Sequence, residues 1–306
     1  IEALYKDRID DHLAELAHHY SRTSNARKAV EYLFRAAGQA TAARSAFPEA
    51  ISLLSSALEF LKHLPDDAER ARTELAVQSR LLPSIGAVEG WAAPELEPLY
   101  ARGRELCAQI RDPALTFPVL FEQWLTRLVK LELDLALELA DKLLALAEER
   151  RDAKMLLSAN WARGNTLLDI GELISANEHL QKAVAVFDLR QPIPAQVEYS
   201  LQAELRRVAS LGHLYGCLYQ LGYPDRARVK SRETLEVAQR SSVHFILVAA
   251  YWLAAQYNLL SGDSPAAQKH AEEAMVLIEA TGIQAFSPWV TNLKGGALIA
   301  QGHYEE

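Results

Sequence analysis

The sequence is poor in residues that interrupt helices and in residues that cross-link chains. Among 306 residues there are 14 glycines, 12 prolines and 2 cysteines. This scarcity favours helix, because Gly and Pro are the main helix breakers. Cys107 and Cys217 lie far apart, each within an apolar helical pattern. We therefore interpret them as reduced core thiols of a cytoplasmic protein and not as a disulfide framework.

Two classes of partner are excluded by charge and hydropathy. The formal net charge is −8, with acidic and basic residues interspersed, and no run of Lys and Arg supplies the basic face that a nucleic-acid binder needs. The longest apolar run covers residues 245–255 and is shorter than the roughly 18–20 residues that span a bilayer. We expect neither nucleic acid nor a membrane as a direct partner.

Motifs that carry catalysis or hold a cofactor are also missing. The sequence contains no Gly-rich phosphate loop followed by Lys and Ser or Thr, no Gly-x-Ser-x-Gly elbow and no Cys-x-x-Cys pair. We predict no catalytic residue, no metal site and no cofactor for this chain.

A cluster of histidines near the N-terminus is the nearest approach to a metal site. His12, His18 and His19 accompany Glu15, but the spacing differs from the His-Glu-x-x-His arrangement of zinc proteases. We interpret these side chains as solvated or interfacial. His18 and His19 are predicted to contact a neighbouring domain.

What the sequence does contain is a repeating glycine. Gly171, Gly222, Gly262 and Gly302 are separated by 51, 40 and 40 residues, and each closes an apolar helical stretch. Glycine permits the left-handed turn that often ends a helix. Five residues after the first three glycines comes a small residue that lets the next helix pack closely, namely Ala176, Ala227 and Ala267. The pattern predicts a series of helical hairpins.

The clearest copy of the repeat, residues 160–183, resembles a tetratricopeptide unit. Gly164 stands at the small position of the first helix and Leu167 at the following large one, while Ala176 and Leu180 face back from the second helix. Asn160 and Arg163 replace the consensus Trp and Leu, and a weaker copy has Leu131 where the turn glycine is expected. The period near 40 exceeds the usual length of about 34 and leaves HEAT-type repeats as the structural alternative. The order Gly-then-Ala favours tetratricopeptide repeats.

We therefore predict an all-α protein, a right-handed superhelical solenoid of antiparallel helix pairs that forms one domain over residues 1–306. Residues 83–94 are expected to form a loop inserted in a hairpin, and residues 188–195, with two prolines, a second irregular stretch. Apolar periodicity and the breakers predict helices near 2–22, 25–45, 47–63, 67–87, 94–110, 113–129, 132–150, 152–170, 173–187, 196–221, 224–240, 243–261, 264–281 and 286–301.

Several segments together resemble the C-terminal repeat region of large bacterial signalling proteins. These segments are residues 13–20, 29–38, 50–58, 90–95 and 221–225. Members of that family couple a predicted signal-transduction ATPase to an adenylate or guanylate cyclase or to another output domain. The resemblance implies that the nucleotide-binding and cyclase parts precede the repeats in a longer parent protein, which these repeats regulate. Because the chain opens on Ile1 without Met, we expect it to be a fragment.

The predicted function is a non-catalytic scaffold that binds a peptide, a helix or a partner domain in a concave groove. In the tetratricopeptide frame, certain first-helix positions face that groove, and aromatic rings mixed with amides suit peptide recognition. These positions are Phe121, Leu125, Trp161, Asn165, Asp169, Tyr219, Trp252, Gln256, Leu259, Trp289, Asn292 and Ile299.

Three alternatives stay open at this point. The repeats could sense a small molecule or dock other domains of the same parent chain, and so control an upstream ATPase or cyclase. An all-α enzyme would need a cavity with convergent titratable groups, for which the sequence shows no signature. Alternatively, several of the groove positions, Trp161 and Trp252 above all, could fill gaps between long helices. Pairing of two copies through residues 286–304 is a further expectation, since a final half-repeat would leave an apolar face uncovered.

Overall fold

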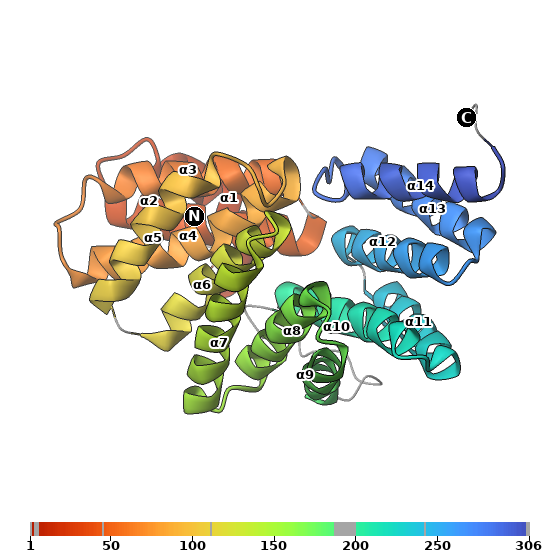
Figure 1. Cartoon of the computed structure of the whole chain (residues 1–306). Coiled ribbons are helices and arrows are strands. Elements are labelled where there is room, and N and C mark those ends of the chain that lie inside the picture. The colour runs from red at the N-terminus through yellow and green to blue at the C-terminus, as the bar shows by residue number, and fades with distance from the viewer. Residues whose placement is uncertain are drawn as a thin grey trace. The chain divides into compact units, whose positions relative to one another are not determined.

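The computed structural model describes residues 2, 6–44, 46–110, 112–186, 200–241 and 243–303, and every regular element in these ranges is a helix. The predicted all-α class is confirmed (Figure 1). The elements are a 3₁₀ helix η1 (Lys6–His12) and α-helices α1 (Leu13–Tyr20), α2 (Ala26–Arg44), α3 (Phe47–Leu61), α4 (Ala68–Glu89), α5 (Leu96–Ile110), α6 (Pro113–Val129), α7 (Leu133–Arg150), α8 (Ala153–Ile170), α9 (Leu173–Ala185), α10 (Ser200–Gln220), α11 (Pro224–Gln239), α12 (His244–Leu260), α13 (Ser264–Thr281) and α14 (Ser287–Ala300).

The chain divides into two compact units, residues 1–122 and 123–306. We call them unit 1 and unit 2. Each unit has buried apolar clusters of its own, one of them built from α1 to α6 in unit 1 and another from α10 to α12 in unit 2. That the whole chain forms a single domain stays a prediction.

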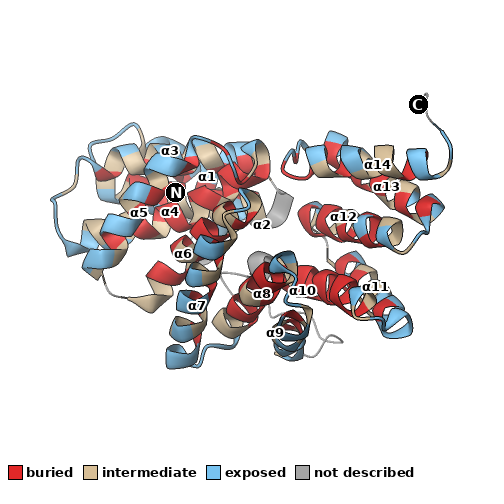
Figure 2. Cartoon of the chain, in the orientation of Figure 1, coloured by how far each residue is buried: buried red, intermediate tan, exposed pale blue. Residues whose placement is uncertain are grey.

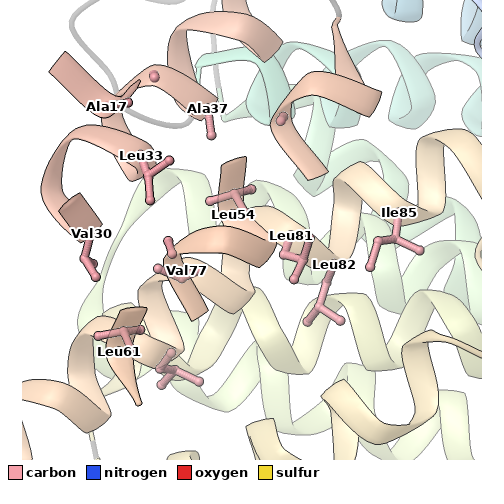
Figure 3. Close-up of a cluster of buried hydrophobic side chains, with 14 of the residues drawn as sticks. Ala17, Val30, Leu33, Ala37, Leu54, Leu61, Val77, Leu81, Leu82 and Ile85 are labelled. Carbon is pink, nitrogen blue, oxygen red and sulfur yellow. The ribbon is translucent and has the colours of Figure 1, made fainter. Parts of the chain in front are cut away.

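Unit 1 is held together by aliphatic side chains from successive helices. Figure 3 shows Leu33 of α2, Leu54 of α3, and Val77 and Leu82 of α4 gathered in one cluster. Each of these side chains is at most 4% exposed. Every fully buried aliphatic side chain of this size stabilises the fold by roughly 1.5–3 kcal/mol, so the apolar stripe of each helix determines which face packs inward (Figure 2).

Two predictions for unit 1 were wrong. The single helix expected over 2–22 is broken, because η1 contains Arg8 with a non-helical φ of −136° and α1 begins only at Leu13. The loop expected over 83–94 is shorter, because α4 continues through Pro83 to Glu89.

Packing explains why α4 continues past its proline. The α4 residues on either side of Pro83, among them Leu82 and Ile85, are buried, and that burial outweighs one lost backbone hydrogen bond. Gly86 is a packing residue and not a turn residue, since a Cβ there would lie 2.6 Å from the Trp91 ring. The chain turns at Gly90, which has a φ of 89°. The second irregular stretch, 188–195, lies outside the described residues.

Unit 2 repeats one turn five times. In each case the residue after the turn position donates its N–H to the carbonyl of the residue four positions before the turn position, which is the Schellman arrangement. The N···O distances are 2.9 Å for Glu132–Arg127, Glu172–Leu167, Tyr223–Leu218 and Asp263–Asn258, and 3.0 Å for His303–Leu298. The turn residue has a positive φ throughout, and it is one of the four repeated glycines in every copy but the first, which has Leu131.

The contacts inside the hairpins are those of tetratricopeptide repeats. Ala136, Ala176, Ala227 and Ala267, five residues after each turn position, are fully buried. In the clearest copy, a Cβ on Gly164 of α8 would lie 2.8 Å from Leu180 Cγ of α9. The glycine thus lets the two helices pack closely, and the helix pairs α8–α9, α10–α11 and α12–α13 pack as antiparallel hairpins.

Helices α10 and α12 approach closely because α10 carries two glycines one helical turn apart. Leu253 fills the space beside Gly212, and the Tyr257 ring lies directly against Gly216. A Cβ would lie 2.6 Å from Leu253 Cδ1 at the first position and would overlap the Tyr257 ring at the second. The two glycines thus set the spacing of these neighbouring helices.

This packing predicts opposite effects for two helical glycines. Gly216→Ala should lower the free energy of unfolding by about 1–3 kcal/mol, because a well-packed core accommodates an added methyl group only by moving its neighbours. Gly295→Ala in α14, where no atom lies within 4 Å of the new Cβ, should raise it by about 0.5–1 kcal/mol. Chemical denaturation of both variants tests this, and a Gly216→Ala protein as stable as the wild type would contradict the described packing.

Candidate functional site

The first helices of the repeats in unit 2 form a continuous layer. Helix α8 packs against α10, α10 against α12, and α12 against α14, while α9, α11 and α13 are the second helices of their hairpins (Figure 1). Residues at matching positions on the first helices therefore become neighbours although some 40 residues separate them in the sequence.

One aromatic or imidazole ring from each first helix lies in a row along this layer. Ring centroids are 5.2 Å apart for Trp124 and Trp161, 5.9 Å for Trp161 and His213, 6.4 Å for His213 and Trp252, and 5.4 Å for Trp252 and Trp289. These distances lie in the range of favourable aromatic pairs. We call these five residues the aromatic row.

Exposure increases along the aromatic row toward the C-terminus. Trp124 is fully buried and Trp161 is 7% exposed, whereas Trp252 and Trp289 are only half-buried. Trp252 and Trp289 stack at an interplanar angle of 28°, and the buried Phe286 ring contacts both, with centroid distances of 5.4 Å to Trp252 and 6.1 Å to Trp289. We call the Trp252–Trp289 pair the tryptophan platform. The rings of the platform stay partly accessible to solvent, and the buried part of the row packs the helices of the layer together.

The polar atoms of the buried part find partners within the protein. Trp124 Nε1 donates to Thr166 Oγ1 at 2.9 Å. His213 Nδ1 lies 2.6 Å from the Ala209 carbonyl oxygen and 3.3 Å from Trp161 Nε1. The same nitrogen faces a carbonyl acceptor and an indole donor: it donates to Ala209 in the tautomer protonated at Nδ1 and accepts from Trp161 Nε1 in the other. Burial among these rings lowers the pKa of His213 to about 4, although its hydrogen bond to Ala209 acts in the opposite direction.

Polar side chains flank the tryptophan platform. Gln256 lies one helical turn after Trp252, Asn292 lies three residues after Trp289, and both are exposed. Exposed Asp169 ends α8. Desolvation by surrounding protein raises the pKa of the Asp169 carboxyl to about 6.

The predicted groove residues fall into three groups. Phe121, Trp161 and Asn165 are buried; Leu125, Tyr219, Trp252, Leu259 and Trp289 are half-buried; Asp169, Gln256, Asn292 and Ile299 are exposed. Phe121 belongs to unit 1, where it stacks on Phe117 at 6.5 Å. The structure brings Trp161, Trp252 and Trp289 into one row, and their role in binding stays a prediction.

Sequence reasoning missed three members of this arrangement, His213, Trp124 and Phe286. A signal for His213 existed, since it lies nine residues before its turn glycine while Trp161 and Trp252 lie ten before theirs. Trp124 and Phe286 occupy other positions, so only the tertiary packing connects them with the row.

Asn160 and Arg163 of α8, which replace residues of the tetratricopeptide consensus, are bridged by His179 of α9. Arg163 Nε donates to His179 Nε2 at 3.1 Å, and His179 Nδ1 lies 3.0 Å from Asn160 Oδ1. Asn160 Nδ2 also donates to the Leu156 carbonyl at 2.9 Å, and Arg163 pairs with Asp141. Burial, together with the Arg163 charge, lowers the pKa of His179, which keeps the ring neutral in this network.

The N-terminal histidines do not converge. His12 Nδ1 lies 3.1 Å from Glu15 Oε2, whereas His18 and His19 are exposed on α1. No group of three or more His, Cys, Asp or Glu residues in the described ranges is arranged to hold a metal ion. None of the helices described combines the length and apolar character of a bilayer span. Contact of His18 and His19 with another domain stays a prediction.

Two solved structures share this fold. A Rap protein complexed with competence and sporulation factor matches 99% of this chain and 78% of its own length, with a TM-score of 0.68 and 13% sequence identity. The apo form of RapI matches 90% of this chain and 98% of its own, with a TM-score of 0.54 and 13% identity. At this identity the likeness shows the fold alone. No family model and no curated protein matches the chain.

His213 predicts a pH dependence of stability. Its pKa in the folded protein, about 4, lies below its ordinary value of 6.5, so between these values the unfolded chain binds a proton that the folded chain does not. Its contribution is complete above pH 6.5 and is lost as the pH falls toward 4, by about 3 kcal/mol. Asp169 acts in the opposite sense, because its raised pKa destabilises the fold above pH 6 and this penalty is gone below 3.8.

His213→Phe keeps a ring in the row and removes its titration. Denaturation of wild type and variant at pH 7, 5.5 and 4 gives a stability difference in which Asp169 cancels. The difference should shift by about 3 kcal/mol in favour of the variant between pH 7 and pH 4. A difference that is independent of pH would show that His213 is not a buried neutral histidine.

Proposed function

We propose that unit 2 is a non-catalytic protein-interaction module that binds a peptide or a helix of a partner protein over its layer of first helices. The observation that carries this proposal is the half-buried tryptophan platform with an exposed amide on each of its two helices, Gln256 on α12 and Asn292 on α14.

The chemistry of the platform suits a peptide. Two stacked indole rings provide a large apolar surface that loses little conformational entropy on binding. Gln and Asn side chains carry both a donor and an acceptor, so each can pair with a peptide group of an extended chain. The related fold of a Rap protein complexed with competence and sporulation factor supports a peptide as ligand.

Other predicted groove residues extend this surface along unit 2. Tyr219 and Leu259 are half-buried, and Asp169 and Ile299 are exposed on the first helices of their repeats. Asp169 supplies a carboxylate for a basic side chain of the ligand. Buried Trp161 and Asn165 support the layer from within.

A regulatory setting follows from the resemblance to the repeat regions of signalling ATPases. In that setting the bound partner is an effector or another domain of the same parent chain, and binding controls an upstream ATPase or cyclase. Reading the gene upstream of residue 1 tests this setting separately. A gene that encodes no nucleotide-binding domain there would end it and leave the peptide-binding proposal intact.

Peptide binding is tested with an array of immobilised random peptides, followed by fluorescence anisotropy with the best binder. Gln256→Ala/Asn292→Ala should weaken binding about tenfold, since each lost hydrogen bond contributes about 0.5–1.5 kcal/mol. The melting temperature should not change, because both side chains are exposed. Trp252→Ala should weaken binding by more than about 30-fold.

The matched control is Asn177→Ala/Gln181→Ala on α9. It removes the same two side-chain types from the second helix of a hairpin. In the wild type Gln181 Nε2 donates to Asn177 Oδ1 at 3.0 Å. This control should bind like the wild type. Saturable binding that survives both Gln256→Ala/Asn292→Ala and Trp252→Ala would show that the platform is not the site.

A further inference from the structure

Leu131, at the turn between α6 and α7, is unfavourable in two ways. It has a φ of 58°, in the left-handed region that glycine occupies at the four equivalent turns. That conformation is strained for a residue with a Cβ atom. Its side chain is also 74% exposed, the highest value among the exposed large apolar residues of the chain's described part.

The fold obtains no benefit from this side chain. The turn is closed by backbone atoms, with Glu132 N donating to the Arg127 carbonyl at 2.9 Å and Leu131 N to the Leu128 carbonyl at 2.9 Å. Glycine or asparagine would make the same bonds with less strain. Strain that stability does not require is typical of functional positions.

Leu131 is one of four exposed aliphatic residues at two successive turns that follow first helices. The others are Leu135 in the first turn of α7, 48% exposed, and Ile170 and Ile174 at the turn between α8 and α9, 39% and 72% exposed. We call these four residues the turn ledge. They form two pairs, each with a spacing of four residues.

The two turns lie at the same edge of unit 2. Trp124 of α6 contacts α8 through its ring, 5.2 Å from that of Trp161, and through its hydrogen bond to Thr166. Because α7 follows α6 through a reversing turn and packs against α8 as the next helix, the turns that follow α6 and α8 lie at the same end of these helices (Figure 1). Leu131 lies seven residues after Trp124, and Gly171 lies five residues after Thr166. Both turns therefore lie within about two helical turns of this contact.

Acidic side chains border the turn ledge. Asp134 and Glu172 are exposed, and neither makes an ion pair or side-chain hydrogen bond with the rest of the described structure. Glu132 is held by Arg127 at 2.8 Å. Near the ledge residues in the sequence, the three acids Glu132, Asp134 and Glu172 outnumber the two bases Arg127 and Lys130. Positions near helix N-termini account for single carboxylates, but not for the exposed aliphatic residues between them.

We propose that the turn ledge is the docking surface for a cationic amphipathic helix of a partner protein. An apolar strip bordered by carboxylates complements a helix that carries aliphatic residues on one face and Lys or Arg beside them. Aliphatic side chains of that helix cover Leu131, Leu135, Ile170 and Ile174. Its basic residues pair with Asp134 and Glu172. This surface is independent of the tryptophan platform on α12 and α14.

The probe is a synthetic amphipathic helix with leucines on one face and lysines on the other, titrated by fluorescence anisotropy. Leu131→Asn is the informative variant, because Asn tolerates the left-handed conformation. We expect it to bind the probe at least tenfold more weakly while its melting temperature stays equal or rises. A loss of stability in this variant would show that the Leu131 side chain serves the fold. Binding as tight as that of the wild type would show that Leu131 does not contact the probe. Either result overturns the proposal.

Matched variants separate docking from general attraction to an acidic protein. Asp134→Asn/Glu172→Gln should weaken binding and reduce its salt dependence, whereas Glu148→Gln/Glu149→Gln, an equal change of charge at exposed positions of α7, should not. Val276→Asn, which replaces a 65% exposed residue of α13, controls for Leu131→Asn.

Equal losses of affinity for the probe in test and control variants would overturn the proposal. So would a Leu/Glu helix that binds as tightly as the Leu/Lys helix. Gln256→Ala/Asn292→Ala should leave probe binding unchanged, which keeps this test apart from that of the platform.

Discussion

The left-handed turn at the end of each first helix is the constraint on which the rest of unit 2 depends. One residue with positive φ and one hydrogen bond across the turn reverse the chain in the same way five times, at Leu131, Gly171, Gly222, Gly262 and Gly302. Identical turns make successive first helices parallel and bring equivalent positions side by side. The aromatic row and the layer it stabilises follow from that repetition.

The rings of the aromatic row differ in how far they are buried. Trp161, with Trp124 and His213 beside it, is part of the core. Trp252 also has a ring of each neighbouring first helix beside it, His213 and Trp289, but both tryptophans of the platform stay half-buried. The proposed peptide site is thus the part of the row that the fold leaves uncovered. The turn ledge is a second surface, at the edge where the turns themselves meet solvent.

Local patterns predicted most of the helices. The bounds predicted for 113–129 and 264–281 equal those of α6 and α13, because Asp112 and Asp263 cap helices whose first turn contains a proline. The failure at residues 83–94 had the opposite cause. Pro83 and Gly86 are local breakers, but buried neighbours and the Trp91 ring hold α4 together through both. A prediction from neighbouring residues in the sequence does not include contacts made by another segment of the chain.

By itself the sequence determined the all-α class, the turn glycines, the buried alanines that follow them and the helix positions that carry aromatic rings. These features depend on backbone conformation and on a period of 3.6 residues, both of which act within a few residues of the chain. Only the tertiary structure decided which rings are covered. Trp161 and Trp252 share one position in the repeat, ten residues before a turn glycine, yet differ in exposure. The difference lies in what the adjacent helices place beside each ring, and that depends on residues some 40 positions away.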